Sequence, residues 1–218
     1  MIPIVKDNMG NHADSSNYRG ITISAIASKV LEHVLKVVFF DFLKTTDHQF
    51  GFKRNSSTTH ALHCLKQTVN HYVNNGSRVF SCFLDASKAF DRVNHSVLFE
   101  KLKCRGVPGY LLRILVFWYE NQTMAVRWGN LISNSFQVSN GVRQGGILSP
   151  YLFNMYMDEL STRLNNLKIG CSIDDLFINH LMYADDLVLI SPSTRGLGRL
   201  IEECQNYGLE FDILFKSN

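Results

Sequence analysis

Apolar residues recur along most of the chain at spacings typical of helices and strands. Helical spacing predicts helices over residues 24–43, 55–72, 96–103, 108–120, 149–164 and 197–207. Short apolar runs predict strands over 79–84, 124–128, 135–139, 176–183, 187–190 and 209–215. The run at 79–84 is almost wholly apolar, which predicts a strand buried on both faces. This mixed order, with a hairpin at 183–187, predicts an α+β fold with helices packed on one face of an antiparallel sheet.

Composition narrows the class of protein. The 218 residues are 45% apolar and 19% charged, with 14 Gly and 4 Pro, which excludes disordered and collagen-like chains. The formal charge of +3 is compatible with a polyanionic partner but does not identify one. Five dispersed cysteines without a C-x-x-C pair predict a reducing, intracellular setting. We expect no membrane partner and no secretion, because no apolar run reaches about 18 residues and the first residues do not form a signal sequence.

The strongest chemical signal is a pair of adjacent acids between two apolar runs, Asp185 and Asp186, preceded by Tyr183-Ala184. Neighbouring carboxylates repel each other unless a cation offsets their charge, and Mg²⁺ prefers such oxygen ligands. The alternative is a solvent-exposed turn in which the acids only favour turn geometry. A further acid, Asp85, ends the run at 79–84. If the two segments are neighbours in one sheet, we expect Asp85 and Asp185 to face each other across it and to hold two Mg²⁺ about 4 Å apart, as in phosphoryl transfer.

Several segments together carry a family resemblance. Residues 83–91 (FLDASKAFD), 140–150 (NGVRQGGILSP) and 183–186 (YADD) resemble motifs A, B and C of reverse transcriptases. The branch they resemble most is that of non-LTR (LINE-like) retrotransposons. Residues 17–21 (NYRGI) and 49–54 (QFGFKR) look like its fingers motifs, and 208–217 looks like motif D. The sequence departs from the family pattern at Gly20, where Pro is usual, and at Asp212, where Asn is usual.

The resemblance implies a right-hand polymerase fold with a fingers region at 1–77 and a palm region at 78–218, ending before the primer grip and thumb. The implied activity is that of an RNA-directed DNA polymerase, a nucleotidyltransferase that adds dNTPs to the 3′-OH of a DNA primer on an RNA template. The implied setting is the nucleus or cytoplasm. The thumb and endonuclease regions would belong to the parent element.

The resemblance also implies roles for individual residues. Asp85, Asp185 and Asp186 match the catalytic triad that binds two Mg²⁺ ions, with Mn²⁺ as a substitute. Phe90 matches the ring that excludes a ribose 2′-OH, and its alternative is an ordinary core aromatic. Gln144 matches a residue that can hydrogen-bond the nucleotide, beside a glycine, Gly145, that permits close backbone approach.

Cationic residues in the matched motifs imply contacts with phosphate. Arg19 and Arg143 are candidates for binding the triphosphate or the template backbone. Lys216 aligns with a lysine that could protonate the leaving pyrophosphate. For Lys53 and Arg54, phosphate binding and a solvated surface role are equally compatible with the sequence.

Two other functions fit the same residues. A catalytically inactive remnant would act at most as a nucleic-acid-binding module, and the retained triad does not decide whether this stretch alone is active. An RNA-dependent RNA polymerase would share the palm, but a bulky Phe90 disfavours ribonucleotide substrates.

Overall fold

The computed structural model describes residues 1–217, and the side chains of residues 1–216, in two compact units. The first unit comprises residues 1–42 and 94–149, and the second comprises residues 43–93 and the chain from Pro150 onward. Each unit is therefore assembled from two separate stretches of sequence. The expected division into fingers at 1–77 and palm at 78–218 follows family motifs and stays a prediction.

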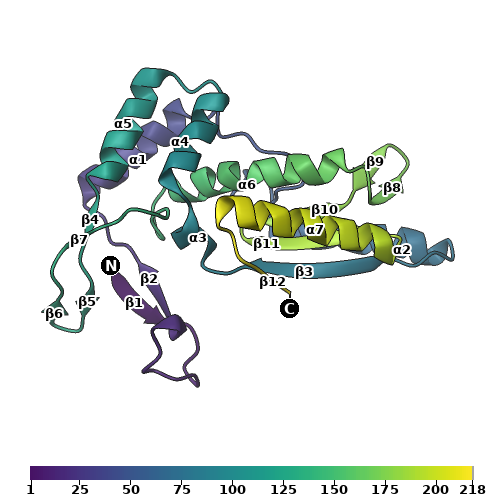
Figure 1. Cartoon of the computed structure of the whole chain (residues 1–218), viewed down its shortest axis with the longest axis horizontal. Helices are drawn as coiled ribbons and strands as arrows, with labels where there is room; N and C mark the ends of the chain where they lie inside the picture. Colours follow the sequence, from purple (N-terminus) through teal and green to yellow (C-terminus); the bar gives the residue numbers. More distant parts are fainter. Residues whose placement is uncertain (218) are drawn as a thin grey trace. The chain divides into compact units, whose positions relative to one another are not determined.

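The second unit is built on a four-stranded sheet with the strand order β10-β11-β3-β12 (Figure 1). These strands span His180–Tyr183, Asp186–Ser191, Phe80–Ala86 and Phe215–Ser217. All three pairings in this sheet are antiparallel. The predicted mixture of helices with an antiparallel sheet is thereby confirmed.

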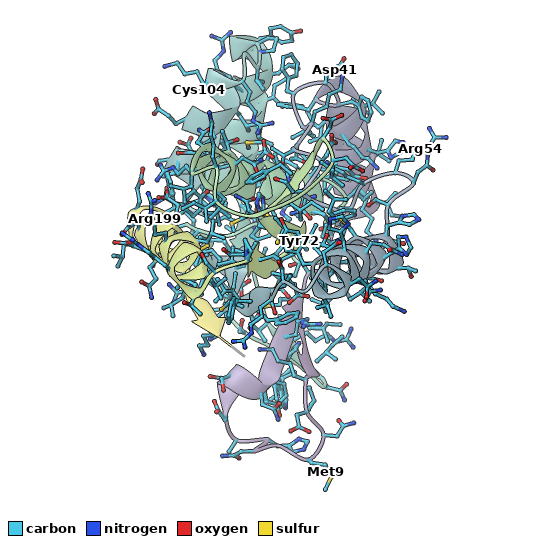
Figure 2. The ribbon with its side chains drawn as sticks, turned by 90° about the vertical axis from the view of Figure 1, so that its right-hand side faces the viewer. Met9, Asp41, Arg54, Tyr72, Cys104 and Arg199 are labelled. Atoms are coloured by element: carbon cyan, nitrogen blue, oxygen red, sulfur yellow. The ribbon has the colours of Figure 1, made fainter. Side chains whose placement is uncertain are left out.

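Helices and a small hairpin complete the second unit. The helices are α2 (Thr58–Asn74), α3 (Ala89–Arg92), α6 (Ser149–Asn166) and α7 (Thr194–Phe211). Helix α7 packs against β3, β11 and β12 and runs along the sheet in Figure 1. Strands β8 (Cys171–Ile173) and β9 (Leu176–Ile178) form the hairpin. The hydroxyl of Tyr72, labelled in Figure 2, accepts a hydrogen bond from Ser172 N at 2.8 Å and so links α2 to this hairpin.

Strand β3 is buried on one face only, so the prediction of burial on both faces is wrong. Leu84 and Ala86 point into the core, whereas Ser81 and Phe83 lie on the opposite face and are exposed. The Phe83 side chain is 47% exposed although it is aromatic. An apolar run does not reveal which of its alternate residues faces water, because side chains of a strand point to opposite faces in turn. One face of the sheet is therefore open beside β3.

The predicted strand at 209–215 is also wrong, because α7 continues to Phe211 and β12 begins only at Phe215. Gly208 does not stop the helix as predicted. Because Gly208 has no side chain, the backbone at Ile213 can pack directly against it. A Cβ at Gly208 would lie 2.4 Å from Ile213 O, and Ile213 N donates to Gly208 O at 3.0 Å. The predicted strand at 176–183 is split, since its first part pairs with β8 and its last part with β11.

The first unit combines short hairpins with three helices. Strands β1 (Ile2–Val5) and β2 (Tyr18–Ile21) pair, with the 3₁₀ turn η1 (Ser15–Asn17) between them and Met9 at the far tip of the connection (Figure 2). The helices are α1 (Ile26–Val38), α4 (His95–Cys104) and α5 (Gly109–Glu120). Four two-residue strands follow: β4 (Thr123–Met124), β5 (Arg127–Trp128), β6 (Leu131–Ile132) and β7 (Phe136–Gln137). The turn predicted at Gly129-Asn130 joins β5 to β6, and β4 pairs with β7.

The elements of each unit are held by buried apolar side chains. In the first unit, α4 packs on α5 and contributes the fully buried Leu98 and Leu102, while α5 contributes Leu115. In the second unit, α6 carries the buried aromatic rings of Phe153 and Tyr156. None of the helices within residues 1–217 has the length and apolar character needed to cross a lipid bilayer.

A buried imidazole sits in the core of the second unit. His180 is fully buried and stacks on His48 at a ring-centroid distance of 4.5 Å. Asn179 Nδ2 donates to Leu164 O at 2.7 Å, which turns its Oδ1 toward His180 Nδ1 at 2.6 Å. The proton of neutral His180 therefore lies on Nδ1, and Nε2 accepts from Ser161 Oγ at 2.7 Å. Burial and the neighbouring His48 hold the pKa of His180 well below its ordinary value of 6.5.

The stability of the second unit should consequently fall as the pH drops below about 6.5, the ordinary pKa of histidine. The unfolded imidazole of His180 takes up a proton that the folded one resists, so acid favours unfolding by up to about 1.4 kcal/mol per pH unit. Urea unfolding at pH 7.5 and 5.5 measures this dependence. His180→Leu should flatten it, and His60→Leu, on an exposed part of α2, should not. An unchanged pH dependence in His180→Leu would contradict the assignment.

Candidate active site

The two adjacent acids lie at a tight hairpin between β10 and β11. Tyr183 and Asp186 form the closing pair, which leaves Ala184 and Asp185 as the two turn residues. Ala184 has a φ of +57°, a left-handed conformation that costs a residue with a Cβ about 1 kcal/mol. Ala86 N, one residue beyond Asp85, donates to Asp185 O at 3.3 Å. The turn is thus fixed directly beside the end of β3.

Three charged residues form one row across the sheet next to this turn. Asp85 on β3 is paired with Asp186 on β11 and with Lys216 on β12. Directly opposite residues of an antiparallel pair point to the same face, with Cβ atoms about 5 Å apart. Asp85 is half-buried, and Asp186 and Lys216 are exposed. Since Phe83 lies on the same face of β3, the row belongs to the open face of the sheet.

The carboxylates offer an all-oxygen donor set, which suits a hard divalent cation such as Mg²⁺. Backbone pairing brings Asp85 and Asp186 into one row and places Asp185 in the adjoining turn. Within residues 1–217, however, no three side chains of His, Cys, Asp or Glu are gathered closely enough to hold a metal ion. The donor chemistry therefore fits the ion, while the described side chains do not form a three-ligand cluster.

Phe90 lies on the short helix α3, five residues after Asp85. Its ring stacks on that of Phe153 at a centroid distance of 4.6 Å and an interplanar angle of 16°. The ring of Phe52 meets Phe90 edge-on at 6.5 Å. Phe90 is nevertheless only half-buried. Its ring is therefore held in place by two aromatic neighbours and still reaches the surface.

In the first unit, the backbone of loop 143–149 is held by close packing that requires glycine at two positions. Thr22 N donates to Gln144 O at 2.8 Å. Gly145 has a φ of +99°, and a Cβ there would lie 3.2 Å from Thr22 O. At Gly146, a Cβ would lie 2.6 Å from Ser149 Oγ and 3.1 Å from Glu32 Oε2. Glycine at positions 145 and 146 therefore permits the close packing of this loop against its neighbours.

Glu32, for which no role was predicted, holds the C-terminal part of this loop. Its carboxylate is buried on α1 and accepts hydrogen bonds from Ile147 N and from Leu148 N, the latter at 3.2 Å. Glu32 Oε1 also lies 3.6 Å from Arg143 Nη1. The signal that could have revealed Glu32 is a charged residue on the face of α1 that also carries the buried Leu35.

Arg143, predicted to contact phosphate, is engaged within the first unit. Its Nε donates to Gln122 Oε1 at 2.9 Å, and its guanidinium lies 4.3 Å from the centroid of the Trp118 ring. Burial lowers the pKa of Arg143, and the nearby Tyr119 and Glu32 oppose that shift. These contacts identify Arg143 as a support of its loop, and phosphate binding by Arg143 stays a prediction.

The remaining cationic candidates differ in their surroundings. Arg19 is exposed on β2, opposite Ile4. The ammonium group of Lys53 donates to the carbonyl oxygens of Thr45 and Thr46, and burial lowers the pKa of Lys53. Arg54 is exposed and extends away from the ribbon in Figure 2.

The predicted site residues thus fall into two groups. Asp85, Phe90, Asp185, Asp186 and Lys216 belong to the second unit, whereas Arg19, Arg143, Gln144 and Gly145 belong to the first. Strand pairing places Asp85 and Asp186 beside Lys216. Arg143, Gln144 and Gly145 lie together in loop 143–149.

Known retrotransposon proteins are similar to the chain over most of its length. A protein of Drosophila melanogaster described as the Pol polyprotein of type-2 retrotransposable element R2DM is 26% identical over 191 residues, 88% of this chain and 18% of that protein. The probable RNA-directed DNA polymerase from transposon X-element of the same species is 31% identical over 67% of this chain and 16% of its own length. The RNA-directed DNA polymerase from mobile element jockey of Drosophila funebris is 28% identical over 83% of this chain and 20% of its own length.

The chain therefore spans about a fifth of the length of these relatives. They are reverse transcriptases of non-LTR retrotransposons, the branch that the motifs predicted.

Solved structures support the fold. Telomerase from Candida albicans, in complex with a fragment of telomeric RNA, superposes on 87% of this chain and 34% of its own, with a TM-score of 0.61 and 12% sequence identity. Telomerase from Candida tropicalis gives the same TM-score of 0.61 over 85% of this chain and 35% of its own, at 13% identity. The family model described as reverse transcriptase (RNA-dependent DNA polymerase) matches residues 5–217. That match covers nearly the whole sequence, so the chain belongs to the reverse transcriptase family.

Proposed function

We propose that this chain forms the catalytic core of an RNA-directed DNA polymerase from a non-LTR retrotransposon. The observation that carries the proposal is the row of Asp186, Asp85 and Lys216 on the open face of the sheet, with Asp185 in the adjoining turn. A row of two carboxylates and an ammonium group on an open face of the sheet suits a substrate that brings both a triphosphate and divalent cations. The reaction would join a dNTP to the 3′-OH of a DNA primer paired with an RNA template.

The three carboxylates have a shared role in this proposal. Asp85, Asp185 and Asp186 would hold two Mg²⁺ ions, or Mn²⁺ in their place. When bound, such cations lower the pKa of the attacking hydroxyl and neutralise the triphosphate. The protein contributes by bringing the acids together through backbone pairing and by leaving this face of the sheet open to the nucleic acid. Lys216, beside Asp85, would donate a proton to the leaving pyrophosphate.

Residues of the first unit would contact the nucleotide and the strands. The Gln144 side chain would hydrogen-bond the sugar or base, and Gly145 would let the backbone approach closely. Arg19 is exposed and would bind a phosphate group. Arg143 would support loop 143–149 and would bind the triphosphate with its guanidinium.

The right-hand arrangement of fingers and palm is part of the same proposal. We also propose that the enzyme acts in the nucleus or cytoplasm. The chain spans about a fifth of the length of its relatives, and we propose that the parent element supplies a thumb and an endonuclease from its other parts.

A primer-extension assay tests the activity. The chain is incubated with a DNA primer annealed to an RNA template, all four dNTPs, and Mg²⁺ or Mn²⁺. We expect extension that depends on the divalent cation and stops when a chelator is added. Binding of the primed template without extension under either cation would instead identify the chain as a nucleic-acid-binding remnant.

Selection against ribonucleotides should depend on Phe90. Phe90→Val should lower the preference for a dNTP over its rNTP by about 10- to 100-fold, because a smaller side chain leaves room for a 2′-OH. The measurement is the ratio of kcat/KM for the two nucleotides. Phe52→Leu is the matched control, since it removes an aromatic contact of Phe90 while the Phe90 ring remains. An unchanged ratio in Phe90→Val would identify Phe90 as an ordinary core aromatic.

A further inference from the structure

The turn that carries Asp185 contains a residue whose conformation needs outside support. Ala184 is 6% exposed and has a φ of +57°, which residues other than glycine adopt rarely. Buried backbone N–H and C=O groups need hydrogen-bond partners. In this turn the strand ladder does not supply them, because the closing pair is Tyr183 with Asp186.

The side chain of Gln49 supplies these partners. Gln49 is 2% exposed, and its Oε1 accepts a hydrogen bond from Ala184 N at 3.0 Å. Its Nε2 donates to Ala184 O at 3.4 Å. A single amide side chain, 135 residues away in the sequence, therefore pairs with both polar backbone groups of the left-handed residue.

The segment that carries Gln49 is itself fixed against β10. Phe50 N donates to Met182 O, and Met182 N donates to His48 O, both at 2.8 Å. Gly51 N donates to Gln49 Oε1 at 2.8 Å, which orients the amide group.

Gly51 also lets the two backbones approach, since a Cβ there would lie 2.5 Å from Ala184 N. Asn154 Nδ2, on α6, donates to Gly51 O at 2.6 Å and so ties the segment to the core.

We propose that Gln49 is a positioning residue for catalysis, which holds Ala184 in its left-handed conformation and thereby sets the place of the Asp185 carboxylate. The inference rests on the proposed function, because Asp185 matters only if it takes part in the reaction. Gln49 does not touch the substrate in this proposal. Its effect passes through the backbone of the turn.

Loss of the amide should loosen the turn and misplace Asp185. Gln49→Met keeps the length of the side chain but leaves Ala184 N without its acceptor. We expect the Ala184 amide to exchange its hydrogen with solvent about 10-fold faster or more. Affinity for Mn²⁺, followed by electron paramagnetic resonance, should fall about 10- to 100-fold. In the extension assay kcat should fall about 10- to 100-fold, with the KM for dNTP nearly unchanged, because a small displacement of a catalytic group slows chemistry more than binding.

One further variant serves as a control for Gln49→Met, and a second should rescue its activity. Gln67→Met makes the same substitution on an exposed position of α2 and should change none of these quantities. Adding Ala184→Gly to Gln49→Met should restore part of the lost kcat, because glycine adopts positive φ without steric cost. If Gln49→Met does not fold, Gln49→Glu replaces it. Its carboxyl oxygens can still accept from Ala184 N and Gly51 N, so protection of the Ala184 amide should persist.

The outcomes separate this inference from the proposed function. Unchanged amide exchange and Mn²⁺ affinity in Gln49→Met would overturn the role of Gln49, whether or not the chain polymerises. If Gln49→Met does not fold, loss of protection of the Ala184 amide in Gln49→Glu would likewise overturn the role of Gln49. If wild type neither binds Mn²⁺ nor extends a primer, the proposed function fails, and the positioning role in catalysis fails with it. In that case the hydrogen-exchange result still decides whether Gln49 holds the turn.

Discussion

Asp185→Asn is expected to reduce nucleotide addition by about 10³-fold or more while the chain remains folded, because it removes a charge on which electrostatic catalysis depends. Asparagine matches the size of aspartate, so the turn itself should survive. Asp185 is directly followed by Asp186, and removing one of two adjacent negative charges relieves their repulsion. In the absence of divalent cations the variant should therefore melt at a temperature no lower than that of wild type.

The second small hairpin of the same unit offers a matched control for this variant. Asp175 is the second residue of the two-residue turn between β8 and β9, as Asp185 is in the turn between β10 and β11. The first turn residue, Asp174, has a φ of +50°, close to the +57° of Ala184. Asp175→Asn should leave primer extension unchanged. Extension at the wild-type rate by purified Asp185→Asn would refute the catalytic role of this acid.

The second large effect is expected on stability. Glu32→Leu should lower the free energy of unfolding of the first unit by about 3–5 kcal/mol, because it leaves the largely buried side chain of Arg143, 11% exposed, without its charged partner. The same variant deprives Ile147 N and Leu148 N of their acceptor. Glu32→Gln keeps an acceptor oxygen and should cost less. Removing both charges in Glu32→Leu with Arg143→Leu should also cost less than removing Glu32 alone.

Trp118 offers a local probe for this measurement, since the Arg143 guanidinium lies over its ring. The chain has a second tryptophan, Trp128, so the series is made in a Trp128→Phe background. Urea unfolding followed by the fluorescence of Trp118 then reports on the first unit. A loss in Glu32→Leu no larger than that in Glu32→Gln would show that the carboxylate does not balance a buried charge.

Much of the fold could be predicted from the sequence, because apolar periodicity marks the faces that meet in the core. The helix at Gly109–Glu120 was predicted within one residue, and β3 differs from its predicted range by one or two residues at each end. The last strand could not be found in this way. Its position depends on the close packing of the Ile213 backbone against Gly208, and the spacing of apolar residues does not reveal such a contact.

The candidate site was predicted only as far as its residues are acids or belong to motifs. Asp85 ends one apolar run and the two adjacent acids precede another, so the sequence predicts neighbouring strands with Asp85 facing Asp185. The strands are neighbours, but the register pairs Asp85 with Asp186 and leaves Asp185 in the turn. Gln49 and Glu32 received no role because each acts on backbone groups more than 100 residues away. A motif match at Gln49 or a charged residue on an apolar helix face at Glu32 can mark such a residue, but it does not reveal which distant backbone groups the side chain binds.

The edge strand β12 places a length constraint on the end of the chain. Asp212 has a φ of +54° at the C-terminus of α7, and its carboxylate is 2.8 Å from Nη1 of Arg92, two residues after Phe90. From this fixed point the backbone reaches Lys216, which is paired with Asp85. Since successive residues of a strand face opposite sides, one residue inserted or deleted between Asp212 and Lys216 would turn the lysine away from the acids. The number of residues between Asp212 and Lys216 therefore matters to the site as much as their identity, and the buried Ile213 restricts that identity as well.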